Sequence, residues 1–184
     1  MGIEPVATIS EILSALAHES RLLEPCKDIV GEDEIALFTE KLNFKRARKG
    51  GTVRLHQDYA YWADVAPIAH RVATAMLFLD DATIEKGCLE VAPGSHQHGA
   101  AARKHGLGFG SREMDLSKFD EGTLVPLEAE AGSVVWFGAF LAHHSLPNRS
   151  DDDRRALLYS YQPSGNPRFQ NIWRNQAAAR APVL

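Results

Sequence analysis

The feature that most constrains the fold is a succession of short apolar runs that begins after Glu34. Gly, Pro, Asn and Asp separate these runs, and these residue types favour turns. Several short strands with turns between them are typical of an antiparallel sandwich or barrel. One run, Arg71 to Leu79, also fits a helix, but its neighbours and the following Asp80–Asp81 favour a strand. The predicted strand-forming runs are Ile35 to Phe44, Thr52 to Asp58, Arg71 to Leu79, Cys88 to Pro93, Thr123 to Ala129, Ser133 to Phe140 and Arg155 to Pro163.

Three further segments lie outside or between the strands of this predicted core, which runs from about residue 34 to 163. Apolar side chains recur at helical spacing from Thr8 to Val30, so this region is predicted to be helical, with Pro25 ending or dividing the helix. The polar segment Gly99 to Gly122 is expected to be either a functional lid or a solvated loop. Asn166 to Leu184 is expected to be a peripheral helix or a frayed tail. The length of 184 residues suits a single domain, residues 1–184.

Composition narrows the classes of partner. The formal net charge is −4, which gives no basic footprint for nucleic acid. No stretch reaches the roughly 18 apolar residues that a membrane helix requires, and the N-terminus lacks the features of a signal peptide. Cys26 and Cys88 are far apart and make a poor disulfide framework, so reduced, buried thiols are expected. These features predict a cytoplasmic protein without nucleic-acid or membrane partners, and they leave the oligomeric state open.

The first candidate for chemistry is the sequence His56-Gln57-Asp58, at the end of a predicted strand. Side chains at positions i and i+2 of a strand point to the same face. An imidazole and a carboxylate on one face can bind one metal ion. By itself the pattern is weak, because a hydrogen-bonded surface pair has the same spacing.

The second candidate is the pair His143-His144, which follows the apolar run Ser133 to Phe140. A histidine just after a buried strand can reach the mouth of a barrel. Two histidines and one carboxylate form the facial triad of non-haem Fe(II) oxygenases, which leaves coordination positions open for a keto acid and O₂. Zinc is the competing metal, since the same ligand set serves zinc hydrolases.

The third candidate is Arg154-Arg155, which opens the last predicted strand. A guanidinium group suits the far carboxylate of a keto acid, whereas a zinc hydrolase requires a nearby general base such as that of HExxH, and none is present. The alternative for either arginine is a surface ion pair with Asp151 to Asp153. Strand alternation predicts that one of the two points inward, but it does not identify which.

Taken together, these segments resemble the phytanoyl-CoA dioxygenase family, which includes bacterial ectoine hydroxylase. The similarity runs from about Leu42 to Pro163. The segments that carry it are NFK (Asn43 to Lys45), LHQDYAYW (Leu55 to Trp62), GCLEVAPGSH (Gly87 to His96) and HHSLPNRSDDDRRAL (His143 to Leu157).

The resemblance implies a double-stranded β-helix, or jelly-roll, core. It also implies an Fe(II)- and 2-oxoglutarate-dependent dioxygenase that hydroxylates a small organic molecule, consumes O₂ and releases succinate and CO₂. His56, Asp58 and His143 correspond to the iron ligands. Retention of Asp58 favours hydroxylation over halogenation, while desaturation and ring closure remain alternatives.

Further roles follow from the same resemblance. In the family pattern the ligand histidine is followed by Ser, Asn and Arg, which here gives Ser145, Asn148 and Arg154. Arg154 is the expected partner of the far carboxylate of 2-oxoglutarate, with help from Ser145 and Asn43. Trp62 is expected at the mouth of the active site, where it would contact substrate, or else in the hydrophobic core.

The remaining polar residues near these motifs are expected to have no ligand role. Gln57 lies on the strand face opposite the ligands, and Lys45, near a strand end, is expected to be solvated. His96 and His98 follow a turn at Gly94 and are expected to be non-ligands.

Two rival functions stay open. Family members usually carry a longer region before the HxD motif, whereas His56 comes early here. This difference supports a non-catalytic, cupin-like module that binds a structural metal or a ligand. A zinc hydrolase with the same ligand set is the second rival. No motif identifies the substrate.

Overall fold

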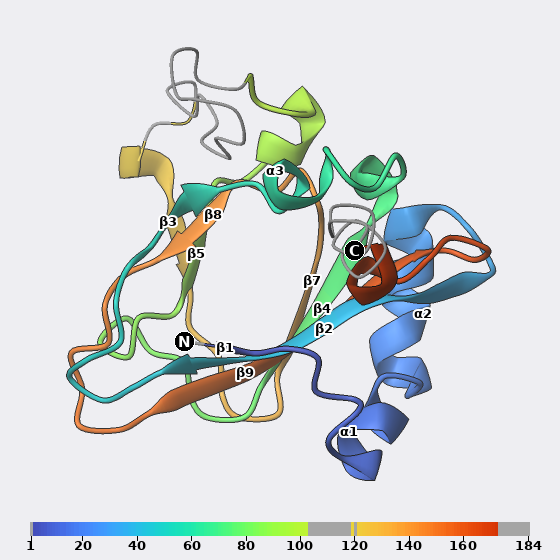
Figure 1. The fold of residues 1–184 in the computed structure, drawn as a ribbon. Coiled ribbons are helices and arrows are strands. Elements are labelled where there is room, and N and C mark those ends of the chain that lie inside the picture. Colours follow the sequence, from blue (N-terminus) through green and yellow to red (C-terminus); the bar gives the residue numbers. More distant parts are fainter. Residues whose placement is uncertain (1, 103–118, 120, 173–184) are drawn as a thin grey trace, which may run out of the picture.

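The protein is a two-sheet β structure in the computed structural model, which describes residues 2–102, 119 and 121–172 (Figure 1). A five-stranded sheet has the order β1-β2-β9-β4-β7, and a four-stranded sheet has the order β3-β8-β5-β6. Every neighbouring pair is antiparallel. The strands are β1 (Gly2–Ile3), β2 (Ile35–Lys45), β3 (Val53–His56), β4 (Ala73–Phe78), β5 (Leu89–Val91), β6 (Val125–Leu127), β7 (Val134–Gly138), β8 (His143–Ser145) and β9 (Arg154–Pro163).

The order of the strands confirms the predicted fold class. After β2 the chain passes to the other sheet for β3 and back for β4. It crosses again for the antiparallel pair β5 and β6, returns for β7, crosses for β8, and ends with β9 between β2 and β4. This winding between two antiparallel sheets is the jelly-roll topology. The predicted strand Arg71 to Leu79 is confirmed over Ala73–Phe78, which form β4, whereas Arg71 ends the 3-10 helix η1 (Ala69–Arg71).

Strand β9 lies between β2 and β4 and separates two apolar layers. Leu157, Tyr159 and Tyr161 belong to a cluster with the N-terminal helices, while Ala156 and Leu158 belong to a cluster inside the barrel. Buried on both faces, the strand is an almost continuous run of buried residues. Its alternate side chains therefore have different functions, and the even-numbered ones of its first half face the interior.

The predicted helical region from Thr8 to Val30 forms two helices, α1 (Glu11–Leu16) and α2 (Ser20–Val30), which pack on the outer face of the larger sheet (Figure 1). The chain divides at residues 17–19 and continues as a helix through Pro25. Leu22 and Cys26 are buried one turn apart on either side of the proline. This packing holds α2 together although Pro25 cannot donate a backbone hydrogen bond.

Four short helical segments complete the described chain: α3 (Tyr59–Trp62), η1 (Ala69–Arg71), η2 (Ser95–His98) and η3 (Glu121–Thr123). Residues 169–172 are also helical. Of the predicted lid Gly99 to Gly122, residues 103–118 and 120 lie outside the described residues, as do residues 173–184 of the C-terminal segment. Both cysteines are buried free thiols. None of the helices that the structure describes has the length and apolar character needed to cross a membrane.

Candidate metal centre

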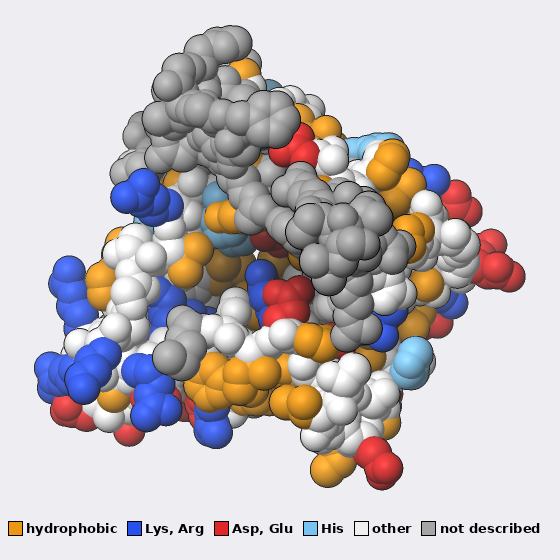
Figure 2. Space-filling model, viewed as in Figure 1, with side chains coloured by type: hydrophobic (Ala, Val, Ile, Leu, Met, Phe, Trp, Pro, Cys, Tyr) orange, Lys and Arg blue, Asp and Glu red, His pale blue; other side chains and the backbone are white. Residues whose placement is uncertain are grey.

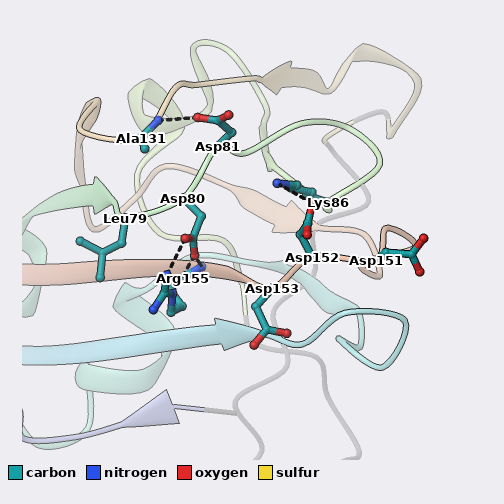
Figure 3. Close-up of a pocket in the computed structure, with 9 residues that line it drawn as sticks. All are labelled: Leu79, Asp80, Asp81, Lys86, Ala131, Asp151, Asp152, Asp153 and Arg155. Carbon is teal, nitrogen blue, oxygen red and sulfur yellow. Dashed lines mark hydrogen bonds and ion pairs between the residues drawn. The ribbon is translucent and has the colours of Figure 1, made fainter.

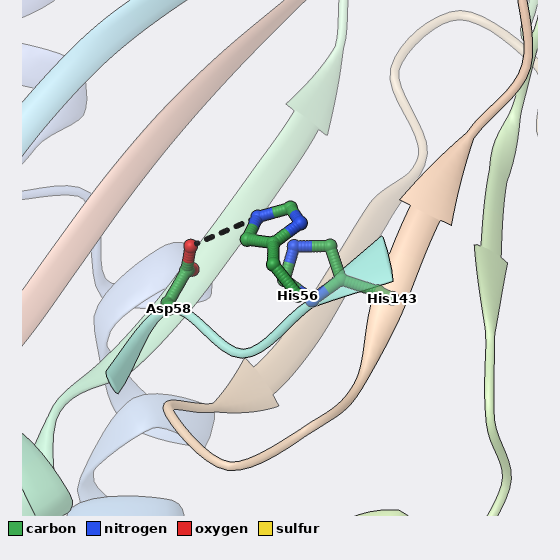
Figure 4. Close-up of side chains that lie close together, drawn as sticks. All are labelled: His56, Asp58 and His143. Atoms are coloured by element: carbon green, nitrogen blue, oxygen red, sulfur yellow. Dashed lines mark ion pairs between the residues drawn. The ribbon is translucent and has the colours of Figure 1, made fainter. Parts of the chain in front are cut away.

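Three predicted ligands meet at the end of the barrel where β3 pairs with β8. His56 is the last residue of β3 and lies opposite His143, the first residue of β8. The two imidazole rings have centroids 4.2 Å apart. Asp58 follows β3 and turns its carboxylate toward His56, with 3.6 Å between Asp58 Oδ1 and His56 Nε2 (Figure 4). One potential ligand atom from each residue lies within 4.8 Å of the other two.

Backbone carbonyls orient both imidazoles in the same way. His56 Nδ1 is 2.8 Å from the carbonyl oxygen of Arg54, and His143 Nδ1 is 2.9 Å from that of Leu141. In each case the carbonyl lies two residues earlier and can only accept, so Nδ1 carries the proton. The lone pair is then on Nε2, the atom that is free to bind a metal.

Electrostatics favour the protonation states that bind a metal. Burial alone would raise the pKa of Asp58, but the interaction with His56 and the nearby His143 and Lys41 outweigh it, and the pKa stays below its ordinary value. Burial lowers the pKa of His143 to about 4, and nearby His56 adds to this effect. Near neutral pH, Asp58 is therefore a carboxylate and His143 is a neutral imidazole, which are the metal-binding forms.

Gln57, between His56 and Asp58 in the sequence, fixes this segment through hydrogen bonds on the face opposite to the two side chains. Its amide donates to the carbonyls of Phe140, at 2.7 Å, and Gly99, at 2.9 Å. Its side-chain oxygen accepts from the backbone N–H of Ala101 at 2.8 Å. Gln57 thus points away from the proposed ligands, as strand alternation predicts. Its hydrogen bonds connect the β3–α3 turn to the loop that contains Phe140 and to the segment Gly99–Ala101.

The three ligands open into a cavity of about 360 Å³ inside the barrel. Figure 2 shows the molecule hollowed on this face, with His and Lys or Arg side chains visible inside the hollow. Asp58 is the only carboxylate among the described residues that line it. The lining residues are Gly2, Lys41, Asn43, Phe44, Lys45, Gly51, Thr52, Val53, His56, Asp58, Met76, Leu89, Phe137, His143, His144, Ser145, Arg154 and Leu158.

Arg154 is a buried cation of this cavity, and no carboxylate of the described residues forms an ion pair with it. Only 4% of its surface is exposed, and its Nε and Nη1 atoms are buried without a hydrogen-bond partner. Burial lowers its pKa, although a guanidinium remains charged in a protein. An unpaired buried donor is destabilising by about 1–3 kcal/mol, and more for a charged group. The arrangement therefore fits an anionic ligand that is bound beside Arg154.

Lys45 contradicts the expectation of a solvated side chain. It is 5% exposed and pairs in register with Arg154 across β2 and β9. Its ammonium donates to the carbonyls of Gly51, at 2.9 Å, and Ser145, at 3.3 Å, and also to that of Leu146. Burial first, and then Arg154, lowers its pKa to about 8. The signal in the sequence was alternation, because Lys45 lies two residues after Asn43 on the same strand face.

Asn43 and Ser145 also line the cavity, in the neighbourhood of Lys45 and Arg154. Asn148, the remaining member of the predicted pattern, is buried and donates to the carbonyls of Lys45, at 3.0 Å, and Asp152, at 2.8 Å. It therefore acts on the cavity through the backbone that carries Lys45.

Arg155 points the other way, to a surface cavity of about 650 Å³ (Figure 3). Its Nε and Nη2 atoms donate to the two carboxylate oxygens of Asp80, at 2.8 and 2.7 Å. Asp81 and Lys86 line the same cavity. His144, the neighbour of His143, lies 3.1 Å from a carboxylate oxygen of Glu90. The two arginines thus point into different cavities, whereas both histidines line the inner cavity and only His143 joins the His56–Asp58 cluster.

The structure does not bring Trp62 to this cavity. Trp62 is buried in a separate cluster, where its ring packs edge-on against Phe38 with centroids 5.3 Å apart. This placement favours the core alternative over a substrate contact. Tyr61, which the sequence interpretation passed over, lies edge-on to the His56 ring with centroids 5.4 Å apart.

Comparison of the sequence with known proteins identifies the family to which the chain belongs. Residues 4–156 match the family model of phytanoyl-CoA dioxygenase. The chain belongs to this family. A phytanoyl-CoA dioxygenase domain-containing protein 1 homolog of Dictyostelium discoideum is 31% identical over 130 residues, which are 67% of this chain and 45% of the relative. The L-proline trans-4-hydroxylase of Streptomyces griseoviridis is 30% identical over 172 residues, 82% of this chain and 63% of the relative.

Solved structures agree on the fold of this family member. The structure of EctD from S. alaskensis with 2-oxoglutarate and 5-hydroxyectoine has 23% sequence identity and a TM-score of 0.72, and the match covers 90% of this chain and 57% of that one. The chain spans about half the length of the curated relatives that it matches, between 41% and 63%.

Proposed function

We propose that this chain is an Fe(II)- and 2-oxoglutarate-dependent oxygenase that hydroxylates a small organic molecule. The observation that carries the proposal is the pairing, in one cavity, of a His-Asp-His set with an unpaired, buried guanidinium group. A metal site alone would leave Arg154 unexplained. A keto acid that chelates the metal and extends a second carboxylate toward Arg154 accounts for both.

His56, Asp58 and His143 are the proposed metal ligands. Two nitrogens and one carboxylate oxygen on one side of an ion are typical of non-haem Fe(II), and they leave its other positions open. When bound, iron and 2-oxoglutarate supply the oxidising chemistry, with consumption of O₂ and release of succinate and CO₂. The protein fixes the Nε2 atoms of the two histidines and keeps Asp58 ionised.

Arg154 is the proposed partner of the far carboxylate of 2-oxoglutarate, with Ser145 and Asn43 as neighbouring hydrogen-bonding groups. A planar guanidinium can bind both oxygens of a carboxylate at once. Lys45 lies beside it and is proposed to add a second positive charge. Binding of the dianion would relieve the repulsion between these two buried cations.

Neither rival function accounts for the cavity equally well. A zinc hydrolase requires a carboxylate or another base beside the metal to activate water, and Asp58 is the only carboxylate among the described lining residues. A non-catalytic module requires no open path to the metal and no unpaired cation. The buried thiols Cys26 and Cys88 support a reducing compartment such as the cytoplasm as the location of the protein.

The proposal is tested by anaerobic addition of Fe(II) and 2-oxoglutarate to the purified chain. A weak charge-transfer absorption band should appear with the wild type and with Arg155→Met, and it should be lost or require far more 2-oxoglutarate with Arg154→Met. Admission of air should then release succinate. If the wild type shows neither the band nor any succinate, the oxygenase proposal is wrong.

A further inference from the structure

A third cation of the cavity, Lys41, has no role in the proposed binding of metal and keto acid. It lies on the cavity-facing side of β2, two residues before Asn43 and four before Lys45. Lys45 is in register with Arg154, whereas Lys41 is in register with Leu158. A strand advances about 3.3 Å per residue, so the backbone positions of Lys41 and Lys45 are separated by roughly 13 Å. Lys41 and Lys45 therefore lie at different ends of the cavity.

Lys41 belongs to the metal end. Lys41 lines the same cavity as His56, Asp58 and His143. Burial alone would raise the pKa of Asp58, but the two histidines and the positive charge of Lys41 keep it low. An anion held by Lys41 would consequently lie next to the metal, where the reacting carbon of a substrate must also lie.

Lys41 is unpaired in the part of the chain that the structure describes. It makes no hydrogen bond or ion pair with another described residue. Glu4, on the N-terminal segment, accepts a hydrogen bond from Thr39 and does not line the cavity. Lysines of a folded surface often lack a partner, but the half-buried Lys41 lines a cavity, where an unpaired ammonium disfavours cations and favours anions.

The net charge of the cavity with metal and 2-oxoglutarate bound also favours an anionic substrate. A divalent metal and doubly charged 2-oxoglutarate compensate each other. Asp58 can balance only one of the three cations Lys41, Lys45 and Arg154. Even with Lys45 neutral, one positive charge remains. Uncompensated charge is unfavourable in a confined, weakly screened site, so the second substrate should bring a negative charge.

We propose that Lys41 binds an oxyanion group of the primary substrate, a carboxylate or a phosphonate, and places the neighbouring carbon beside the metal. This inference rests on the proposed oxygenase function and names the class of molecule it acts on. The competing role for Lys41 is binding of the metal-proximal carboxylate of 2-oxoglutarate itself. The experiment must separate these two anions.

The test uses the chain loaded with Zn(II), which is redox-inactive, and saturating 2-oxoglutarate. Fluorine NMR follows the binding of trifluorobutyrate, trifluoropropylphosphonate and the neutral trifluorobutyramide. With the keto acid site filled, at least one anion should bind about tenfold more tightly than the amide. The tighter of the two anions identifies the headgroup chemistry. Lys41→Met should abolish the preference, and Lys41→Arg should retain it.

Lys86→Met is the matched control, because Lys86 lines the surface cavity and should not influence binding of the probes. Equal affinity of the wild type for anions and amide, while 2-oxoglutarate still binds, would overturn the inference but leave the oxygenase proposal standing. A loss of 2-oxoglutarate affinity in Lys41→Met as large as the loss of probe affinity would also overturn it. Failure of the wild type to bind 2-oxoglutarate would instead refute the oxygenase proposal.

Discussion

Two charged cavities of the described structure differ in a way that indicates what distinguishes a functional site. The surface cavity around Arg155 is the larger, at about 650 Å³, and carries more charged groups. There, Arg155 is bound by both oxygens of Asp80, and Lys86 lies 3.5 Å from Asp152. The inner cavity, at about 360 Å³, has buried cations that lack carboxylate partners. Charges that pair with one another stabilise a surface, whereas buried cations without carboxylate partners favour the binding of an anionic ligand.

The comparison extends to hydrogen bonds within the fold. The aspartates of the surface cavity are used by the protein itself: Asp80 accepts from Arg155, and Asp81 accepts from the backbone N–H of Ala131 at 2.8 Å. Asp58 stands at the start of α3, yet its side chain makes no capping hydrogen bond to that helix. The carboxylate of Asp58 is therefore available to bind a metal, whereas those of Asp80 and Asp81 are already occupied by hydrogen bonds within the protein.

The largest expected effect separates Asp58 from Asp81. Asp58→Asn should lower Fe(II) affinity by at least about a hundredfold, because even residues that only support a ligand contribute 10–100-fold. Asp81→Asn should leave metal affinity unchanged, since an amide oxygen can still accept from Ala131. Titration of Co(II) absorption would measure both variants. Equal metal affinity in the two would remove Asp58 from the site.

The next effect concerns the glycines beside the two cavities. A Cβ on Gly87, which has φ of 68°, would collide with the carbonyl oxygen of Leu146, the same carbonyl that Lys45 contacts. Gly87→Ala should destabilise the fold by about 3 kcal/mol. Gly132, beside Ala131, also has positive φ but nothing within 4 Å, so Gly132→Ala should lower stability by only about 1 kcal/mol. Urea unfolding would measure the difference, and similar losses would contradict it.

The two arginines should give opposite results in binding and stability. Arg154→Met should weaken 2-oxoglutarate binding about 10–100-fold, as expected for loss of a charge-assisted hydrogen-bonded pair. Without ligand the same variant should melt no lower than the wild type, because it removes an unpaired buried charge. Arg155→Met should lower stability by at most about 1 kcal/mol and leave ligand binding intact. Calorimetry and thermal melts test both, and a destabilised Arg154→Met would mean that its charge is already compensated.

The smallest effect is a pH dependence that arises from Lys45. Its pKa is about 8 in the folded chain, below the ordinary 10.5, so the unfolded chain binds more protons between these pH values. Stability should therefore increase with pH across this interval, relative to Lys45→Met, by about 1–2 kcal/mol. Urea unfolding at pH 8 and pH 10 measures the difference between the two proteins. Saturating 2-oxoglutarate should reduce it, because the dianion stabilises the charged form.

Local patterns in the sequence determined much of the fold and pointed to the proposed metal ligands. The turn-separated apolar runs predicted strands, and β4 and β9 lie within them. The i, i+2 spacing of His56 and Asp58 predicted that these two proposed ligands lie together, and alternation predicted Gln57 on the other side. These features depend on neighbours within one strand, where side-chain direction follows a fixed period of two. The family segments then selected His143 and Arg154 from their neighbours.

Only the tertiary structure decided the remaining points, because they depend on contacts between distant segments. The register of β2 against β9 sets Lys45 beside Arg154 and buries both, which strand-end position alone did not suggest. Packing against Phe38 draws Trp62 away from the metal centre. The helical region divides at residues 17–19. Helix α2 continues through Pro25 because its buried side chains pack against the larger sheet. A sequence specifies the period and chemistry of each segment, whereas burial and pairing arise only when the two sheets close on each other.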